Sequence, residues 1–328
     1  MRKLLSPCAV AGTIVVFATL SSNGRSAGQD VDPAELVKDL HALFGEHHAR
    51  ATHAKGVVLD ATFEPTREAS QLSKATVFMD RVQATVRLSD TTGIPEIPDA
   101  DANASPHGLA IKFRLGDGSE MDLVMHSFNG FPAATGAEFD SFLKAAAASG
   151  PGATKPTPIE KYLQTHPNAV PFVTQQKPPP ESLATIIYFG VNAFAFIDKS
   201  GKKTTVRYRF VPDAGEKYLD ATTAASKKPN YLMEEIAERV AKAPVKFVWF
   251  AQVAQPGDKV DDPSSPWPED RQLVKLGTLT LTSMAADQEH LSRSLLFLSN
   301  NIPDGIEAVD PMIEVRGAAY PISFGERQ

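Results

Sequence analysis

Short β-rich runs recur along this chain, and they constrain its fold more than any other feature. Each run is rich in β-branched and aromatic residues, and clusters of Gly, Pro and Asp separate one run from the next. This pattern predicts an α+β fold in which helices surround an antiparallel barrel or sheet. The expected strands span residues 57–63, 76–88, 109–115, 121–126, 185–197, 204–211, 245–254 and 273–282, and the expected helices span 33–44, 137–148, 159–165, 231–241 and 287–298.

Composition narrows the class of protein. The chain has 328 residues, of which 42% are hydrophobic and 8% aromatic, so it has the apolar content for a core and is not a disordered coil. A net charge of −6 leaves no excess of cations to neutralise phosphates, which argues against a nucleic-acid partner. The single Cys excludes an internal disulfide and a Cys-rich metal site. The composition predicts a globular enzyme or binding protein.

The beginning of the chain has the order of a secretory signal peptide. Arg2 and Lys3 provide a cationic start, and an apolar stretch and then small polar residues follow. A membrane anchor is the alternative, but Pro7 interrupts the stretch, whose longest unbroken part is shorter than the roughly 20 residues that span a bilayer. We therefore expect residues 1–27 to be removed. Residues 28–328 would form a single domain without a stable membrane anchor, in the periplasm or outside the cell.

One candidate site residue lies between the first expected helix and the first expected strand. His53 follows the helix end, and the strand that comes next begins near Gly56, a kind of junction at which loops place functional side chains. Other histidines, such as His47, lie on or beside the polar side of a helix, where a histidine generally faces solvent. A solvent-facing ring is also the alternative interpretation of His53.

A second candidate lies near the C-terminus. If this segment is helical, Arg316 and Tyr320 are four residues apart on one face. A guanidinium beside a phenol favours the ionised phenolate, and a phenolate can ligate a ferric ion. The alternative is a tyrosine packed at a helix end with the arginine covering its ring.

Motifs that occur in a fixed order along the chain resemble those of the haem catalases. The resemblance covers about residues 33–327, and its specificity lies in the ordered set rather than in any single motif. It implies a catalase-like antiparallel β-barrel with surrounding α-helices that binds haem b. The matching segments are residues 50–56, similar to the family's distal motif, then 86–89, 106–113, 118–124, 188–194 and 301–306, and finally 316–320, similar to the proximal Arg-x-x-x-Tyr.

The resemblance also implies a role for each candidate residue. Tyr320 would ligate the haem iron as a phenolate, and Arg316 would keep the phenol ionised. His53 would move a proton between the two oxygens of peroxide, with Ser89 orienting its ring. The remaining matches are Arg50, Arg87 and Arg327, which correspond to propionate-binding arginines, Phe139, which corresponds to a ring that packs over the haem, and Phe131, which corresponds to one nearer the substrate channel.

Three departures from the family's pattern concern the distal side and the end of the chain. His126 stands at the position of the distal asparagine, and Asn129 lies three residues further on. Ser105 and His107 replace an aspartate and an arginine of the channel motif. The chain also ends eight residues after Tyr320, where full catalases continue into a helical region. The altered distal residues favour an organic reductant over a second peroxide.

The sequence therefore predicts a haem peroxidase of the catalase-related type. It would reduce hydrogen peroxide or an organic peroxide with a small organic reductant, and it would retain residual catalase activity. Its expected catalytic residues are His53, Ser89 and His126, and we expect a monomer or a small homo-oligomer. The alternatives are a true catalase, a relative that rearranges lipid hydroperoxides, and a carrier of haem or apolar ligands without turnover.

Overall fold

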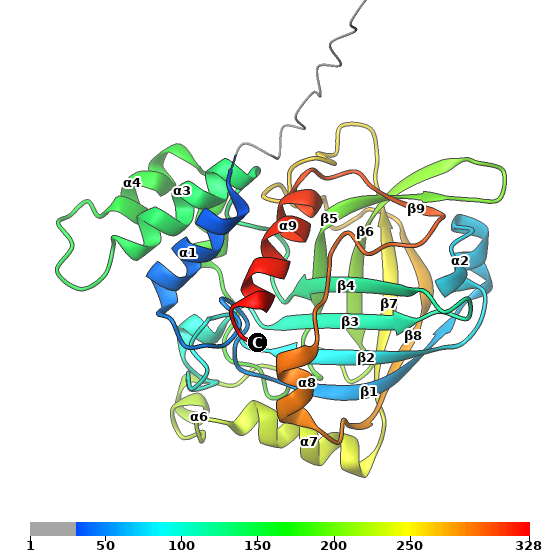
Figure 1. The fold of residues 1–328 in the computed structure, drawn as a ribbon, viewed down its shortest axis with the longest axis horizontal. Coiled ribbons are helices and arrows are strands. Elements are labelled where there is room, and N and C mark those ends of the chain that lie inside the picture. Colours follow the sequence, from blue (N-terminus) through cyan, green and yellow to red (C-terminus); the bar gives the residue numbers. More distant parts are fainter. Residues whose placement is uncertain (1–30) are drawn as a thin grey trace, which may run out of the picture.

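Eight antiparallel strands close into a barrel in the computed structural model, which describes residues 31–328 (Figure 1). The strands are β1 (Gly56–Pro65), β2 (Val82–Ser89), β3 (Gly108–Arg114), β4 (Glu120–His126), β5 (Tyr188–Ile197), β6 (Lys203–Pro212), β7 (Val245–Val253) and β8 (Leu273–Met284), with a short β9 (Ile306–Ala308) added at the edge of β5. The order is β4-β3-β2-β1-β8-β7-β6-β5, and a pairing of His126 with Phe189 joins β4 to β5 and closes the ring. The predicted antiparallel barrel is confirmed.

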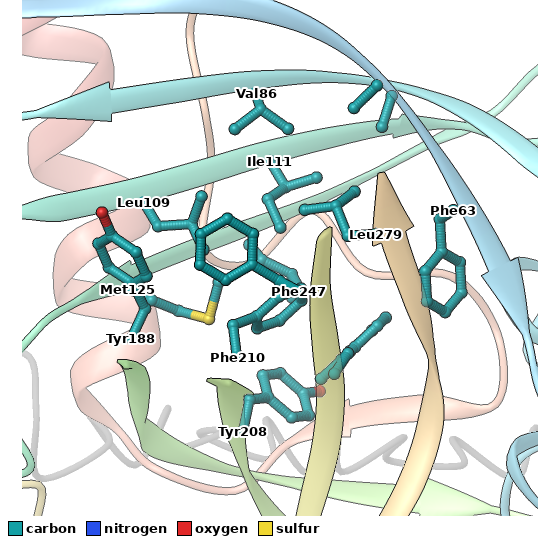
Figure 2. Close-up of a cluster of buried hydrophobic side chains, with 14 of the residues drawn as sticks. Phe63, Val86, Leu109, Ile111, Met125, Tyr188, Tyr208, Phe210, Phe247 and Leu279 are labelled. Atoms are coloured by element: carbon teal, nitrogen blue, oxygen red, sulfur yellow. The ribbon is translucent and has the colours of Figure 1, made fainter. Parts of the chain in front are cut away.

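Aromatic side chains fill the inside of this barrel. Trp249 is fully buried, and its ring centre lies 5.3–5.7 Å from those of Phe63, Phe113, Tyr208 and Phe210. Figure 2 shows part of this cluster, in which side chains from strands on all sides of the barrel meet. Because side chains pack the interior, a site for a large ligand has to lie outside the barrel.

Helices cover the barrel on its outside, and α1 (Pro33–Phe44), α3 (Gly136–Ala147) and α9 (Met312–Gly325) contribute to a second apolar cluster. The N-terminal helix α1 begins at Asp32, whose carboxylate accepts a hydrogen bond from the Ala34 N–H. It packs against α3 and α9, as Figure 1 shows on the left of the barrel. The other helices are α2 (Arg67–Leu72), α4 (Pro158–Thr165), α5 (Ala169–Thr174), α6 (Ala221–Ala225), α7 (Tyr231–Lys242) and α8 (Gln288–Ser294).

The N-terminal prediction stays a prediction. The expected signal peptide at residues 1–27 lies outside the residues that the structure describes. Among the helices within 31–328, none is both long enough and apolar enough to cross a membrane.

The prediction of a strand at 76–88 is wrong for its first residues, 76–81. Thr76–Phe78 forms a short 3₁₀ helix, and β2 begins only at Val82. Val77 and Phe78 are consecutive and both fully buried, whereas alternate residues of a strand point to opposite faces. The run of apolar residues therefore reflects a tight turn that inserts Phe78 into the aromatic cluster of the barrel.

The helix expected at 287–298 is too long, because α8 ends at Ser294 and Leu295 is extended. Leu295 and Phe297 are buried against the outer face of the barrel, which an uninterrupted helix would not permit. The elements α2, α5, α6 and β9 were not predicted, because segments of three to six residues carry too little periodicity.

Candidate functional site

A cavity of about 490 Å³ lies between strands β2–β5 of the barrel and the helices α1, α3 and α9. Its walls are mainly apolar, with Leu36, Phe142 and Met312 among the residues that the three helices contribute. The structure brings all ten predicted site residues to this one cavity: Arg50, His53, Arg87, Ser89, His126, Phe131, Phe139, Arg316, Tyr320 and Arg327.

The strand register explains how residues far apart in sequence reach the cavity. Ser89 of β2 lies opposite Gly108 of β3, and Gly108 lies opposite His126 of β4. Directly opposed residues point to the same face, so Ser89 and His126 both project outward from the barrel. A Cβ atom on Gly108 would lie 2.5 Å from Ser89 Oγ and 2.6 Å from His53 Nδ1. Gly108 therefore leaves the space in which the imidazole and the hydroxyl meet.

His53 is held in the loop between α1 and β1. Its φ of 57° is unusual for a non-glycine residue, and its backbone N–H donates to the Thr91 carbonyl at 2.8 Å. Nδ1 lies 3.1 Å from Ser89 Oγ, within hydrogen-bond distance, and no described residue bonds to Nε2. Burial, and then the nearby Arg87 cation, lower the pKa of His53 to about 3. The ring is therefore neutral near pH 7 and has a nitrogen available to accept a proton.

Arg316 and Tyr320 lie on one face of α9, as their spacing predicted. The Arg316 Nε donates to the Tyr320 hydroxyl oxygen at 2.8 Å, so the guanidinium does more than cover the ring. The same guanidinium donates through Nη1 to Asn192 and through Nη2 to the Val124 carbonyl at 3.1 Å. Asn192 in turn donates to Asp310 Oδ2 at 2.8 Å. This chain of contacts fixes a guanidinium against the phenol oxygen.

The sequence did not predict the roles of Asn192 and Asp310 in holding Arg316. Asn192 lies in a segment that matched the family, and it is a polar residue in a strand that is buried almost throughout. A buried amide indicates that a hydrogen-bond partner is present. The sequence alone could not identify this partner as Asp310, 118 residues away.

Three arginines form a cluster of cations at the cavity. Arg50 donates to the Ser292 and Leu295 carbonyls, and Arg327 donates to the Leu295 and Arg293 carbonyls, so the C-terminal end of α8 and the residue that follows it position both. Arg87 donates to the Ala54 carbonyl at 3.0 Å.

These cations lack anionic partners. In the part of the chain that the structure describes, no carboxylate forms an ion pair with Arg50, Arg87 or Arg327, and Nε of both Arg50 and Arg87 is buried without an acceptor. Burial lowers the pKa of all three, and the mutual repulsion of the cations lowers that of Arg50 and Arg87 further. An anionic ligand would remove this cost, so the cluster suits a ligand that carries carboxylates.

Phe131 and Phe139 belong to an aromatic wall of the cavity. Their ring centres are 4.8 Å apart, and Phe131 also lies 6.4 Å from the ring of His126. Phe172 of α5, which was not predicted, completes this wall at 6.2 Å from Phe131.

The residues that depart from the family's pattern lie in different places. Asn129 donates to Glu269 at 3.0 Å and does not line the cavity. His107 is buried against Asp90, with 3.0 Å between Nδ1 and Oδ1, and also lies outside the cavity lining. Ser105 and His126 do line the cavity. His126, rather than Asn129, therefore faces the same cavity as His53.

Comparisons with known proteins agree with this geometry. A family model described as "Catalase" matches residues 20–327. The chain is 37% identical over 279 residues to a "Catalase-related peroxidase" of Mycolicibacterium paratuberculosis, covering 84% of this chain and 87% of the relative. It is 30% identical over 307 residues to a "Catalase-related peroxidase" of Synechococcus elongatus, covering 92% and 90%. Catalase A from Saccharomyces cerevisiae has the same fold, with a TM-score of 0.74 at 19% identity over 85% of this chain and 61% of that one.

Proposed function

Since the chain belongs to the catalase family and is therefore an oxidoreductase that acts on peroxide, we propose that it is a haem-dependent peroxidase. It reduces hydrogen peroxide or an organic peroxide with a small organic donor and retains residual catalase activity. The observation that carries this proposal is the apolar margin of the cavity. Val173 of α5 lines the cavity and is 42% exposed, so the apolar wall extends to solvent. A margin of this kind suits an organic donor.

Haem b fits the residues that line the cavity. The arginines 50, 87 and 327 have no anionic partner among residues 31–328 and would hold the two propionates, while the apolar walls would contact the porphyrin. Phe139 and Phe131 would pack on its apolar surface. When bound, haem supplies an iron that peroxide oxidises and that an organic donor reduces again.

Tyr320 is the residue that we assign as the iron ligand. The hydrogen bond from Arg316 Nε holds the phenol oxygen in place and compensates its negative charge. Asn192 accepts a hydrogen bond from the guanidinium and is itself held by Asp310, so the cation is fixed beside the phenol oxygen. These contacts would hold the tyrosine oxygen in a fixed position as a ligand of the iron.

His53 is the residue that we assign as the general acid–base. Its Nδ1 is positioned by Ser89, which leaves Nε2 to take a proton from one peroxide oxygen and return it to the other. The ring can begin this cycle as a base because it is neutral. Ser89 and Gly108 contribute by fixing where that ring lies.

The proposal is tested by the absorption spectrum and product balance of the purified protein. A Soret band establishes haem, and the oxidation of a phenolic dye should be faster than oxygen release at the same peroxide concentration. Val173→Glu should raise the KM for the dye and leave oxygen release unchanged, because it places a charge at the apolar margin. Thr174→Glu is the matched control, since Thr174 is exposed but does not line the cavity. Oxygen release that exceeds dye oxidation would identify a true catalase instead.

We also propose export from the cytoplasm, on the pattern of residues 1–27 alone. The mature chain then begins after this segment, and its N-terminus can be read by sequencing protein recovered from the cell envelope or medium. Intact Met1 on that protein would contradict export with cleavage.

A further inference from the structure

His126 faces the same cavity as His53 from a neighbouring strand. Its opposite residue on β3 is Gly108, whose own opposite residue on β2 is Ser89. Two strand spacings therefore separate Ser89 from His126, which is about 10 Å. Ser89 contacts the His53 ring, so the two imidazoles border the cavity on either side of Gly108.

The hydrogen bonding of His126 determines which of its nitrogens carries the proton. Nδ1 accepts a hydrogen bond from the Phe128 N–H at 3.3 Å. Because this contact uses the Nδ1 lone pair, the proton of the neutral ring lies on Nε2. Burial, and then the Arg316 cation, lower the pKa of His126 to about 3, so the ring stays neutral at ordinary pH.

The N–H at Nε2 is buried and has no acceptor among the residues that the structure describes. The rings of Phe131 and Phe172 pack against the imidazole, with centroid distances of 6.4 and 6.3 Å, and restrict its rotation. A buried donor of this kind is costly unless a bound molecule supplies an acceptor.

We propose that His126 is a fixed hydrogen-bond donor, through Nε2–H, to an oxygen or anion bound in the cavity, and that it does not act as a second base. This inference rests on the proposed haem-dependent function and divides the work between the two histidines. His53 moves the proton, whereas His126 has no free lone pair with which to accept one. Its contribution is to position and stabilise an acceptor.

Fluoride binding to the ferric holoenzyme tests this donor without turnover. His126→Phe keeps a ring and removes the N–H, while His126→Asn restores an N–H donor through its amide. The fluoride dissociation constant should rise at least about tenfold in His126→Phe, as expected for a lost hydrogen bond to a charged acceptor. It should return to within about threefold of the wild type in His126→Asn. Asn129→Ala is the matched control and should bind fluoride like the wild type, because Asn129 is bonded to Glu269.

An unchanged or smaller dissociation constant in His126→Phe would overturn the inference. If His126→Phe does not load haem, His126→Leu replaces it as the variant without a donor, and the comparison with His126→Asn decides in the same way. A wild-type protein that binds no haem would instead contradict the proposed function, so the two failures are distinguishable.

Discussion

Two sets of polar groups border the cavity, and they differ in charge. The α9 set is a chain of ionic and polar groups that begins at Tyr320 and continues through Arg316 and Asn192 to Asp310. The barrel-side set comprises His53, in the loop before β1, and its hydroxyl partner Ser89 on β2. The His53 ring remains neutral. Under the proposed function, the guanidinium lies against the oxygen assigned to the iron, and the residue assigned as the acid–base group is uncharged.

The largest effect should follow from removing the oxygen of the α9 set. Tyr320→Phe offers iron no ligand atom and leaves Arg316 without its acceptor, so haem should be lost or bound very loosely. The ratio of Soret absorbance to protein absorbance measures this loss. Tyr162→Phe is the control, because Tyr162 is a buried tyrosine that does not line the cavity. Full haem occupancy with an unchanged spectrum in Tyr320→Phe would disprove the ligand assignment.

On the barrel side, His53→Ala should slow peroxide consumption by about 10²–10⁴-fold, the range for general acid–base catalysis. Haem content should barely change, because the residue assigned to the iron lies on α9. His47→Ala is a suitable control, since His47 is exposed and bonds only to the Phe44 carbonyl. A rate that stays within a few-fold of the wild type would remove His53 from the mechanism.

The double variant His53→Ala/His126→Phe tests whether the two histidines have different roles. If His126 is only a donor, His126→Phe should reduce the rate by the same factor in the wild type and in His53→Ala. A steeper loss in the His53→Ala background would mean that His126 serves as a substitute base. Single-turnover rates with hydrogen peroxide provide this comparison.

A smaller effect is expected from a change that moves His53 without removing it. Gly108→Ala places a methyl group within 2.6 Å of both Ser89 Oγ and His53 Nδ1, so one of the two has to shift. We expect about a tenfold to hundredfold loss of rate with haem retained, because misplacement of an acid–base group by an ångström has costs of this order. Gly116→Ala is the control, since no atom lies within 4 Å of its added Cβ. Equal rates in both variants would show that the register does not position His53.

The same two sets show what the sequence could predict. Arg316 and Tyr320 are four residues apart on a helix, so local spacing placed this pair on one face, whereas Arg87 and Ser89 were identified only through the resemblance to the catalases. The contact of Asn192 with its acceptor depends on two segments that meet only in the folded chain, and no local pattern predicts it.

The misplaced element ends have the same origin. The sequence at 76–81 predicts a strand, but in the structure it forms a tight turn that places Phe78 inside the barrel. The segment after α8 reads as helix, yet its extended backbone turns the Leu295 carbonyl toward Arg50 and Arg327. In both places tertiary contacts override local propensity, and in the second they position the cation cluster.

The last expected effect concerns stability rather than rate, and it follows from the low pKa of His126. The pKa of His126 is about 3 in the folded chain and about 6.5 for an unperturbed histidine, so the unfolded chain takes up the proton first as the pH falls. Its contribution to stability is therefore fully present above about pH 6.5 and is lost as the pH falls toward 3, with a slope of at most about 1.4 kcal/mol per pH unit. His126→Asn cannot titrate, so its free energy of unfolding should fall less steeply between pH 6.5 and 4. Urea unfolding at a series of pH values measures both slopes, with Asn129→Ala as a variant that should keep the wild-type slope. Parallel curves for His126→Asn and the wild type would mean that His126 is not held neutral by its surroundings, and the contrast between the two sides of the cavity would then rest on His53 alone.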